Sequence, residues 1–335
     1  MMYRIVRNTY HPVVKHYMDV IYKAAKKTSY GAENVDYKQR HVKRDVIVCD
    51  SPIIALYYLI RGYKNLAVWF QGVLPEESFI SHHSHIRSFL LGMVEYMVLK
   101  CAKCVFLVSE EMKTHYQNKY HVNLEKKSFI MPCFNETSLN EVAFEKSIEG
   151  KPIEFLYVGS LSKWQCFTET VDLYSRIEQQ ARVPVKLLVF TKEKELAENT
   201  VLQFGIGSFE IDYVESDELA QRIQNCKYGF VVREDTIINQ VATPTKFSNY
   251  LSNGIIPIFS RCLKSFFRIS SEYGVGIPCD IMDLDTAAQL VLADMDREHS
   301  EIELRVKYQK VFDDYYSTER YIGKISCFLN EIKWS

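Results

Sequence analysis

The sequence predicts an α/β protein of two Rossmann-like domains that face each other across a cleft. Short apolar strands rich in β-branched residues alternate with helical segments, which is the pattern of a parallel sheet covered by helices. A polar segment near the middle of the chain interrupts the alternation, which then starts again. The length of 335 residues is also that of two ordinary domains rather than one.

In the first half, the first clear strand is 45–50, which is apolar, β-branched and closed by Ser51 and Pro52. Gly62 is expected to end the next helix, and Ser109 is a good N-cap for a later one. The expected helices are 53–62, 85–103 and 110–120, and the further strands are 65–70, 104–108 and 128–131.

Residues 136–151 are polar and charged and end in Gly-Lys-Pro, which is typical of a linker. We therefore expect a first domain over 1–150 and a second over 151–317. The amphipathic helix 318–332, within a C-terminal segment 318–335, is expected to pack back on the first domain. In the second domain we expect strands 153–158, 185–190, 209–214, 228–232 and 255–259, and helices 166–180, 192–199, 216–225 and 246–252.

The helix expected at 216–225 has a suitable start. Ser216 is a candidate N-cap, and Asp217 and Glu218 suit the positive end of the helix dipole.

Composition argues against several classes of function. A net charge of −1 does not favour nucleic acid as a partner. The nine cysteines are scattered, and the first residues do not form a secretory leader, so we expect reduced thiols and a cytoplasmic protein. Cys101 and Cys104 lack a second pair at zinc spacing, and His82, His83 and His85 are expected to be exposed, so no metal site is predicted.

Apolar residues recur at helical spacing along 85–103, and we expect this stripe to belong to the core. The alternative is peripheral contact with the cytoplasmic leaflet of a membrane, because Arg87, Lys100 and Lys103 flank the stripe. The stripe consists of Ile86, Phe89, Leu90, Met93, Val94, Met97 and Val98.

Ligands of parallel sheets bind beyond the carboxyl ends of the strands, so the loops that follow strands carry the candidate site. The strand 153–158 leads into Gly159 and Ser160, where a glycine allows close approach of a ligand, and Lys163 follows as a phosphate partner. Arg233 follows the strand 228–232 and suits a bidentate phosphate contact. The alternatives are a tight turn with a solvated lysine and a surface loop with internal ion pairs.

A third loop precedes the helix 246–252. Thr243 or Thr245 is expected to cap this helix, and Lys246 adds a positive charge at its start. The alternative is an ordinary capped helix with a solvated lysine.

Four segments, taken in order, resemble family 4 glycosyltransferases of the GT-B type. TPTKFSNYLSNGIIPI resembles the P-x-K-x-x-E-Y-L-A-x-G-x-P-V-I signature of that family, and FLYVGSLSKW resembles its YVGRLxxxKG segment. VFLVSEEMKTHY and IMPCFNE are similar to two segments of its first domain. The resemblance covers about residues 45–335 and implies a metal-independent enzyme that binds a nucleotide-diphosphate sugar as co-substrate, without a bound cofactor.

The sequence departs from the family pattern at several positions. Ser160 stands where the family usually has arginine. The family's Glu-x7-Glu pair aligns with Val241 and Asn249, so a retaining mechanism has no support. The second glutamate of the pair contacts the donor ribose in relatives, and Asn249 is expected to bond a hydroxyl there more weakly.

The segment 69–78 resembles the family's HGxxPE loop near the acceptor, with Gln71 in place of the histidine. Glu76 and Glu77 are its carboxylates, and either would serve as the general base that an inverting transfer needs. The alternative is that both only complement the positive end of a helix.

The resemblance implies transfer of a sugar from a nucleotide sugar to a glycan or lipid-linked glycan in the biosynthesis of a surface polysaccharide such as capsule or O-antigen. Lys163, Arg233 and Lys246 would neutralise the diphosphate leaving group, and domain closure would exclude water. Two alternatives stay open: another enzyme on tandem Rossmann halves, such as an epimerase or a phosphoglycerol-type transferase, and a non-catalytic partner subunit that lacks the glutamates.

Overall fold

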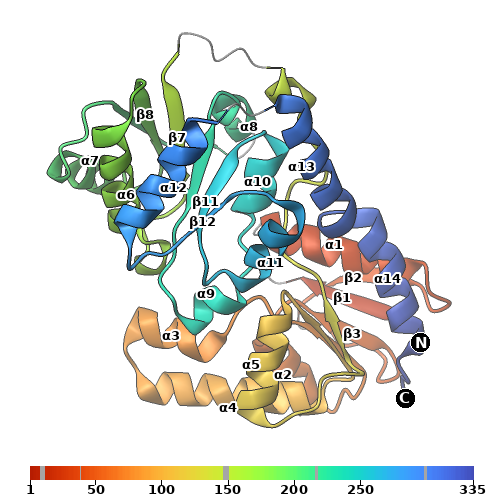
Figure 1. The fold of residues 1–335 in the computed structure, drawn as a ribbon. Helices are drawn as coiled ribbons and strands as arrows, with labels where there is room; N and C mark the ends of the chain where they lie inside the picture. Colours follow the sequence, from red (N-terminus) through yellow and green to blue (C-terminus); the bar gives the residue numbers. More distant parts are fainter. Residues whose placement is uncertain (8–11, 38, 146–150, 216–217, 298–299) are drawn as a thin grey trace. The chain divides into compact units, whose positions relative to one another are not determined.

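A computed structural model describes the chain except for residues 8–11, 38, 146–150, 216–217 and 298–299. The chain forms two compact units, each with a six-stranded parallel sheet and helices around it (Figure 1). The first unit consists of Met1–Asn135, Gln240–Thr243 and Ser317–Ser335, and the second of Glu136–Asn239 and Pro244–Tyr316. The predicted α/β class with two Rossmann-like domains is confirmed.

The sheet of the first unit has the strand order β2-β1-β3-β4-β5-β6. The edge strand β2 and the strand β1 beside it precede the first strand that the sequence indicated. In β1, Tyr3, Ile5 and Val6 are buried, whereas Arg4 pairs with Asp45 at 2.8 Å. The strands are β1 (Tyr3–Arg7), β2 (Ala32–Asp36), β3 (Val46–Cys49), β4 (Leu66–Trp69), β5 (Cys104–Leu107) and β6 (Ser128–Ile130).

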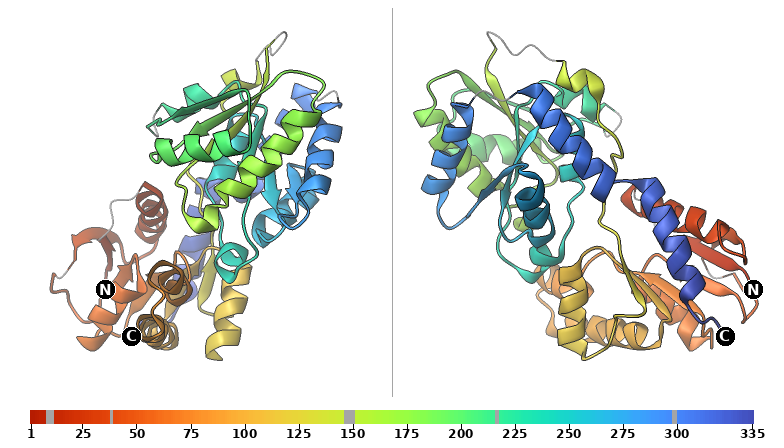
Figure 2. Two further views of the ribbon diagram at one scale, coloured as in Figure 1. Left: turned by 90° about the vertical axis from the view of Figure 1, so that its left-hand side faces the viewer. Right: turned by 45° about the vertical axis from the view of Figure 1, so that its right-hand side comes forward.

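The helices of the first unit include the last helix of the chain, which packs against the first (Figure 2). Tyr17 of α1 stacks on Trp69 of β4 with ring centroids 3.9 Å apart, which fixes α1 on the sheet. The helices are α1 (Pro12–Lys26), α2 (Pro52–Ile60), α3 (Leu74–His82), α4 (His85–Cys101), α5 (Glu110–Tyr120) and α14 (Thr318–Glu331).

Two helix ends in the first unit have the capping residues that the sequence predicts. The Ser109 hydroxyl accepts a hydrogen bond from the Met112 N–H at 3.1 Å and caps α5. Gly62 follows α2 with φ +79°, a backbone conformation that glycine adopts without strain.

The sheet of the second unit has the order β12-β11-β10-β7-β8-β9. Its strands are β7 (Ile153–Val158), β8 (Val185–Phe190), β9 (Phe209–Asp212), β10 (Tyr228–Val231), β11 (Ile256–Ser260) and β12 (Ile277–Cys279). Its helices are η1 (Glu141–Phe144), η2 (Lys163–Gln165), α6 (Phe167–Gln180), α7 (Lys194–Gln203), α8 (Leu219–Ile223), α9 (Ile237–Val241), α10 (Lys246–Ser252), α11 (Lys264–Tyr273), α12 (Leu284–Met295) and α13 (Glu301–Tyr315); the last residues of α9, Gln240 and Val241, belong to the first unit.

The helix expected over 216–225 is the short α8, which begins at Leu219. Ser216 and Asp217, the expected start of that helix, lie outside the described residues. Glu218 occupies the N-cap position of α8 and makes no side-chain cap bond.

The expectation that the stripe of 85–103 belongs to the core is wrong for most of its length, and of its residues only Val98 is buried. Ile86, Phe89 and Met93 of α4 are 76%, 68% and 42% exposed. The face that α4 turns inward carries Glu95, which is fully buried. Within the described chain, no helix is long and apolar enough to cross a membrane.

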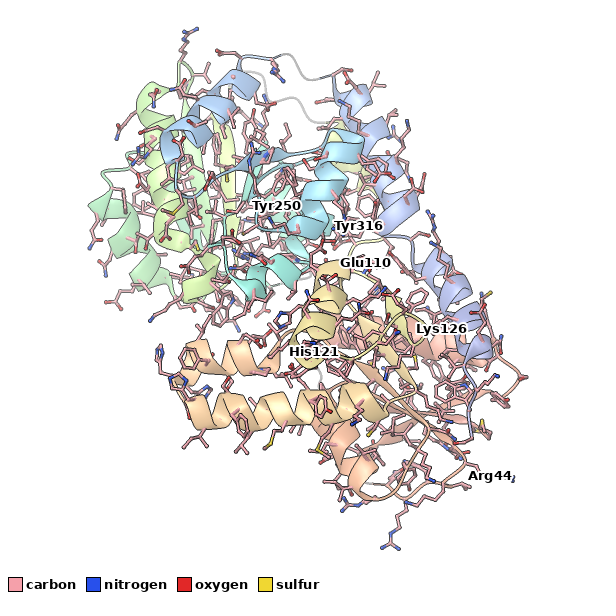
Figure 3. All side chains as sticks on the ribbon, turned by 60° about the horizontal axis from the view of Figure 1, so that its bottom comes forward. Arg44, Glu110, His121, Lys126, Tyr250 and Tyr316 are labelled. Carbon is pink, nitrogen blue, oxygen red and sulfur yellow. The ribbon has the colours of Figure 1, made fainter. Side chains whose placement is uncertain are left out.

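Gly229 in β10 lets the α10 helix approach the sheet of the second unit. A methyl group at Gly229 would come within 2.6 Å of the ring of Tyr250, a residue labelled in Figure 3. The Tyr250 hydroxyl donates to the Phe230 carbonyl at 3.2 Å, so the ring cannot move away without losing this bond.

We expect Gly229→Ala to lower the free energy of unfolding by about 1–3 kcal/mol, because overpacking forces a shift of α10 or of β10. Urea denaturation followed by circular dichroism measures the change. Gly207→Ala is the matched control, because an added methyl group there meets no atom within 4 Å. Equal stability of the two variants would show that Tyr250 does not restrict residue 229.

Candidate functional site

The second unit collects candidate site residues at one edge of its sheet. Gly159 directly follows β7, and Arg233 lies just beyond β10. The strands β7 and β10 are parallel neighbours, so their carboxyl ends meet at the same edge. Lys246, the first residue of α10, reaches the same place.

Lys246 packs against the loop that follows β7. Its Nζ donates to the side-chain oxygen of Gln165 at 2.9 Å and lies 5.0 Å from the centre of the Tyr157 ring. A Cβ on Gly159 would lie 3.0 Å from this Nζ, and Gly159 has φ +135°. Glycine is therefore required here both by backbone conformation and by the approach of the lysine.

Arg233 is 4% exposed, which is rare for an arginine that has no anionic partner. Its Nη1 donates to the carbonyl oxygens of Val232 at 2.8 Å and of Gln165 at 3.2 Å. Its backbone N–H donates to the hydroxyl of Ser260 at 2.8 Å. These bonds fix the guanidinium without neutralising it.

Two cations thus lie side by side, and no carboxylate of the described residues pairs with either. Among the ion pairs of the described residues, none includes Arg233 or Lys246. Burial lowers the pKa of Arg233, and burial together with the neighbouring Arg233 lowers the pKa of Lys246 well below its usual value. Both shifts reflect the cost of holding positive charge in this environment, and an anion bound here would offset that cost.

Gln165 connects the two cations and was not predicted from the sequence. Its side-chain oxygen accepts from Lys246, and its main-chain oxygen accepts from Arg233. It lies in η2 directly after the candidate loop that contains Gly159 and Lys163, but a neutral side chain is not among the residue types expected to bind phosphate.

The side chains of the other predicted donor-site residues of the second unit do not take part in these hydrogen bonds. The Ser160 hydroxyl bonds the Ser162 hydroxyl at 2.6 Å, and the Ser160 carbonyl accepts from the Tyr157 hydroxyl at 2.7 Å. Lys163 is exposed at the start of η2. Asn249 lies in α10, and its Oδ1 is buried without a hydrogen-bond partner among the described residues.

The expectation that Thr243 or Thr245 caps α10 is wrong. Thr245 occupies the N-cap position with helical dihedrals (φ −64°, ψ −16°), so its hydroxyl does not reach a free N–H of the helix. The Thr243 hydroxyl instead accepts from the backbone N–H of Cys133 at 2.9 Å, inside the first unit.

In the first unit, Glu76 lies between two basic side chains of α5. One of its carboxylate oxygens is 2.7 Å from Lys119 Nζ and 3.4 Å from His115 Nε2. Burial raises the pKa of Glu76, but the adjacent His115 and the hydrogen bond and charge of Lys119 outweigh it and lower the pKa below its ordinary value. Glu76 is therefore held as a carboxylate.

Glu77 and Glu95 satisfy the start of α3, where Val73 provides no side-chain cap. Glu77 accepts from the Val73 N–H at 3.1 Å, and Glu95 accepts from the Leu74 N–H at 2.9 Å. A Cβ on Gly72 would lie 1.9 Å from a carboxylate oxygen of Glu77, so a side chain at position 72 would collide with this carboxylate. Burial raises the pKa of Glu77.

Glu95 also connects α4 with α5. Its carboxyl oxygens accept from the hydroxyls of Tyr116 at 3.2 Å and Tyr120 at 2.7 Å. Burial raises its pKa to about 7.

Gln71 and the histidine group complete the predicted residues of this region. Gln71 is exposed and donates to the Asp50 carbonyl at 2.9 Å. His82, His83 and His85 are exposed. In the described parts of the chain, no three or more His, Cys, Asp and Glu side chains form a group that could hold a metal ion.

The buried carboxyl of Glu95 should make stability depend on pH. The folded protein keeps this proton up to about pH 7, whereas the ordinary pKa is 4.5, so the contribution of Glu95 is complete below 4.5 and is lost as pH rises to about 7. The loss is about 3 kcal/mol at ~1.4 kcal/mol per pKa unit.

Glu95→Gln should remove this slope, so its unfolding free energy rises relative to wild type between pH 4.5 and pH 8. Urea denaturation followed by tryptophan fluorescence measures both proteins across this range. Glu331→Gln, at an exposed position in the last turn of α14, should reproduce the wild-type profile. Parallel profiles for wild type and Glu95→Gln would contradict the assignment.

Comparison with known proteins gives a match by structure only. No family model and no curated protein matches the chain by sequence. The structure is similar to that of a sucrose-phosphate synthase from Thermosynechococcus elongatus, with a TM-score of 0.69 and 11% identity over 99% of this chain and 98% of that one. It is also similar to the apo form of the lipopolysaccharide outer core galactosyltransferase WaaB, with a TM-score of 0.66 and 12% identity over 98% and 100% of the two chains.

A third similar structure is a UDP-forming α,α-trehalose-phosphate synthase from Burkholderia xenovorans in complex with glucose-6-phosphate. Its TM-score is 0.61 and its identity 12%, over 86% of this chain and 74% of that one. At these identities the similarity concerns the fold, and the fold that these proteins share with this chain is that of GT-B glycosyltransferases.

Proposed function

We propose that this protein is a glycosyltransferase that transfers a sugar from a nucleotide-diphosphate donor. One observation carries the proposal: Arg233 and Lys246 are held beside each other at the carboxyl edge of the second unit's sheet, and neither has an anionic partner among the residues that the structure describes. A diphosphate would supply the missing negative charge and accept hydrogen bonds from both side chains.

The same two cations would assist the chemical step. In the transfer, an acceptor oxygen forms a bond to the anomeric carbon while the bond from that carbon to the diphosphate oxygen breaks. The electron pair stays on the diphosphate, whose charge increases, and cations already in position stabilise the charge as it develops. The hydroxyl proton of the acceptor needs a base, and we choose Glu76 because Lys119 and His115 hold it as a carboxylate, whereas the Glu77 carboxyl group fixes the start of α3.

Further residues would contribute to donor binding. The unpaired, buried Oδ1 of Asn249 would accept a hydrogen bond from a ribose hydroxyl, where family 4 enzymes use a glutamate. Gly159, Ser160 and Lys163 would border the phosphates, and Thr243 and Thr245 would offer loop contacts. The family 4 relationship, with its divergence at Val241 and Asn249, belongs to this proposal.

Uridine diphosphate is the nucleotide to test first, because one similar structure is of a UDP-forming enzyme and another, of S. aureus TarM, contains UDP, although this chain spans only 56% of the latter. For the acceptor we propose a glycan or lipid-linked glycan of a surface polysaccharide, in line with the similarity to a lipopolysaccharide galactosyltransferase. We place the enzyme in the cytoplasm and propose that it works without a metal or bound cofactor.

A non-catalytic partner subunit is the second candidate, since Val241 and Asn249 replace both glutamates of the family pair. Such a subunit would bind the nucleotide sugar, or nothing, without releasing nucleoside diphosphate. Another nucleotide-sugar enzyme on this fold would release a different product.

Lys246→Met should weaken binding of uridine diphosphate by roughly ten- to hundredfold, because a charge-assisted hydrogen bond of about 1.5–3 kcal/mol is lost. The unliganded melting temperature should not fall, since methionine keeps the apolar stem and removes a buried, unpaired charge. Calorimetry and thermal shift measure the two effects. Lys192→Met, at an exposed lysine of the same unit, is the matched control. Wild-type affinity in Lys246→Met would refute the diphosphate site.

Glu76→Gln should reduce release of uridine diphosphate from UDP-glucose or UDP-galactose, in the presence of acceptor, by about 10²–10⁴-fold, the usual contribution of a general base. Nucleotide affinity should stay at the wild-type level. Glu77→Gln should instead lower the melting temperature and keep most of the activity, because its carboxylate holds the Val73 N–H. An active Glu76→Gln enzyme would remove Glu76 from the mechanism.

A further inference from the structure

The α4 helix of the first unit presents an apolar stripe to solvent. Ile86 is 76% exposed, Phe89 68% and Leu90 50%, and Met93 and Met97 follow at 42% and 43%. These positions are spaced i, i+3, i+4, i+7 and i+11, so they share one face of the helix. An exposed apolar row of this length is unusual for a surface without a partner.

Polar contacts on the opposite face hold α4 in this orientation. The Ser88 hydroxyl donates to the Pro75 carbonyl at 2.9 Å, and Glu95 bonds the Leu74 N–H and the hydroxyls of Tyr116 and Tyr120. Gly92, between Ser88 and Glu95, lies against Pro75 and Tyr120. Rotating the stripe inward would break these bonds, so the outward position of the apolar face is built into the unit.

The exposed charges on α4 and just after α2 have one sign. Arg87 and Lys100 are exposed on α4, whereas Glu95, its single carboxylate, is fully buried. The neighbouring helix α2 contains no charged residue, exposes Ile53 and Ile60 at 54% and 73%, and is followed by the exposed Arg61 and Lys64.

This arrangement decides between two occupants of the stripe. In a twofold dimer whose α4 helices are antiparallel, Arg87 of each copy would face Lys100 of the other copy. If the two helices are parallel, Arg87 would face Arg87 and Lys100 would face Lys100. Either pairing brings cations together without an anion between them. An anionic lipid surface instead matches both the apolar row and the positive charges at its two ends.

We propose that the exposed stripe of α4 is a docking surface for an anionic lipid bilayer. The helix would lie in the plane of the interface, with Ile86, Phe89 and Met93 among the acyl chains and Arg87 and Lys100 at the phosphates. Tyr96, 38% exposed and bonded through its hydroxyl to Lys100 Nζ at 3.3 Å, would lie at the headgroup level. The proposal stands on α4 alone and does not depend on the transfer reaction.

Vesicle co-sedimentation of the full chain tests it, with phosphatidylcholine vesicles and with vesicles that contain phosphatidylglycerol. We expect binding to the anionic vesicles, weaker binding to the neutral ones, and weaker binding to the anionic ones as salt increases. Ile86→Ser combined with Phe89→Ser should reduce the partition coefficient at least about tenfold, given the apolar area withdrawn from the bilayer.

Ile302→Ser is the matched control, because Ile302 is 77% exposed, like Ile86, but lies on α13 of the second unit. This variant should bind anionic vesicles as wild type does, and unchanged circular dichroism should show that all the variants are folded. Arg87→Gln with Lys100→Gln should selectively reduce binding to anionic vesicles.

Several results would overturn the proposal. Absence of binding by the wild-type chain, or equal loss in the Ile86/Phe89 and Ile302 variants, would do so. A dimer in solution that the Ile86/Phe89 variant dissociates, without any vesicle binding, would assign the stripe to a second copy of the chain instead. If the wild-type chain binds anionic vesicles but not uridine diphosphate, the proposed function is rejected and the docking surface on α4 is retained.

Discussion

The candidate site of the second unit depends on Gln165, which holds the positive charges of Arg233 and Lys246 close together and away from bulk water. It offers one oxygen to each cation: its side-chain amide receives Lys246 and its main-chain carbonyl receives Arg233. Because Gln165 belongs to the loop after β7, whereas the cations come from the end of β10 and the start of α10, it binds three segments together. Neutral dipoles orient the charges without satisfying them, so the charges remain available to a ligand.

Much of this arrangement can be predicted from the sequence because it depends on local patterns. The strands β7 and β8 and the helix α10 begin and end at the predicted residues, since apolar runs and the Asn253–Gly254 helix end are strong short-range signals. The chemistry of glycine and lysine after a buried strand and at a helix start predicts Gly159 and Lys246 as site residues. Their contact with each other follows from the sheet order, in which β10 lies next to β7, and that order is a long-range property.

The features that the sequence does not predict correctly have physical causes too. β1 reads as polar because it contains Arg4 and Arg7 among its buried side chains, and the carboxylates that pair with Arg4, Glu33 and Asp45, come about thirty and forty residues later. The stripe of α4 has the period of a core helix, yet tertiary contacts of Ser88 and Glu95 turn the opposite face inward. Periodicity identifies a helix and its apolar face, but it does not say which face the neighbouring helices will cover.

The first unit is discontinuous in sequence, and this has a consequence for how such a protein can be recombined. Its sheet and helices come from Met1–Asn135, but α14, which packs on α1, comes from the end of the chain. Gln240–Thr243 also belongs to it, where Ser109 donates to the Val241 carbonyl at 2.7 Å. A chimera made by joining two genes at the apparent linker would therefore exchange α14 together with the second unit. A new donor specificity is better introduced as an internal cassette that replaces Glu136–Tyr316 and retains the native Gln240–Thr243 and the final helix.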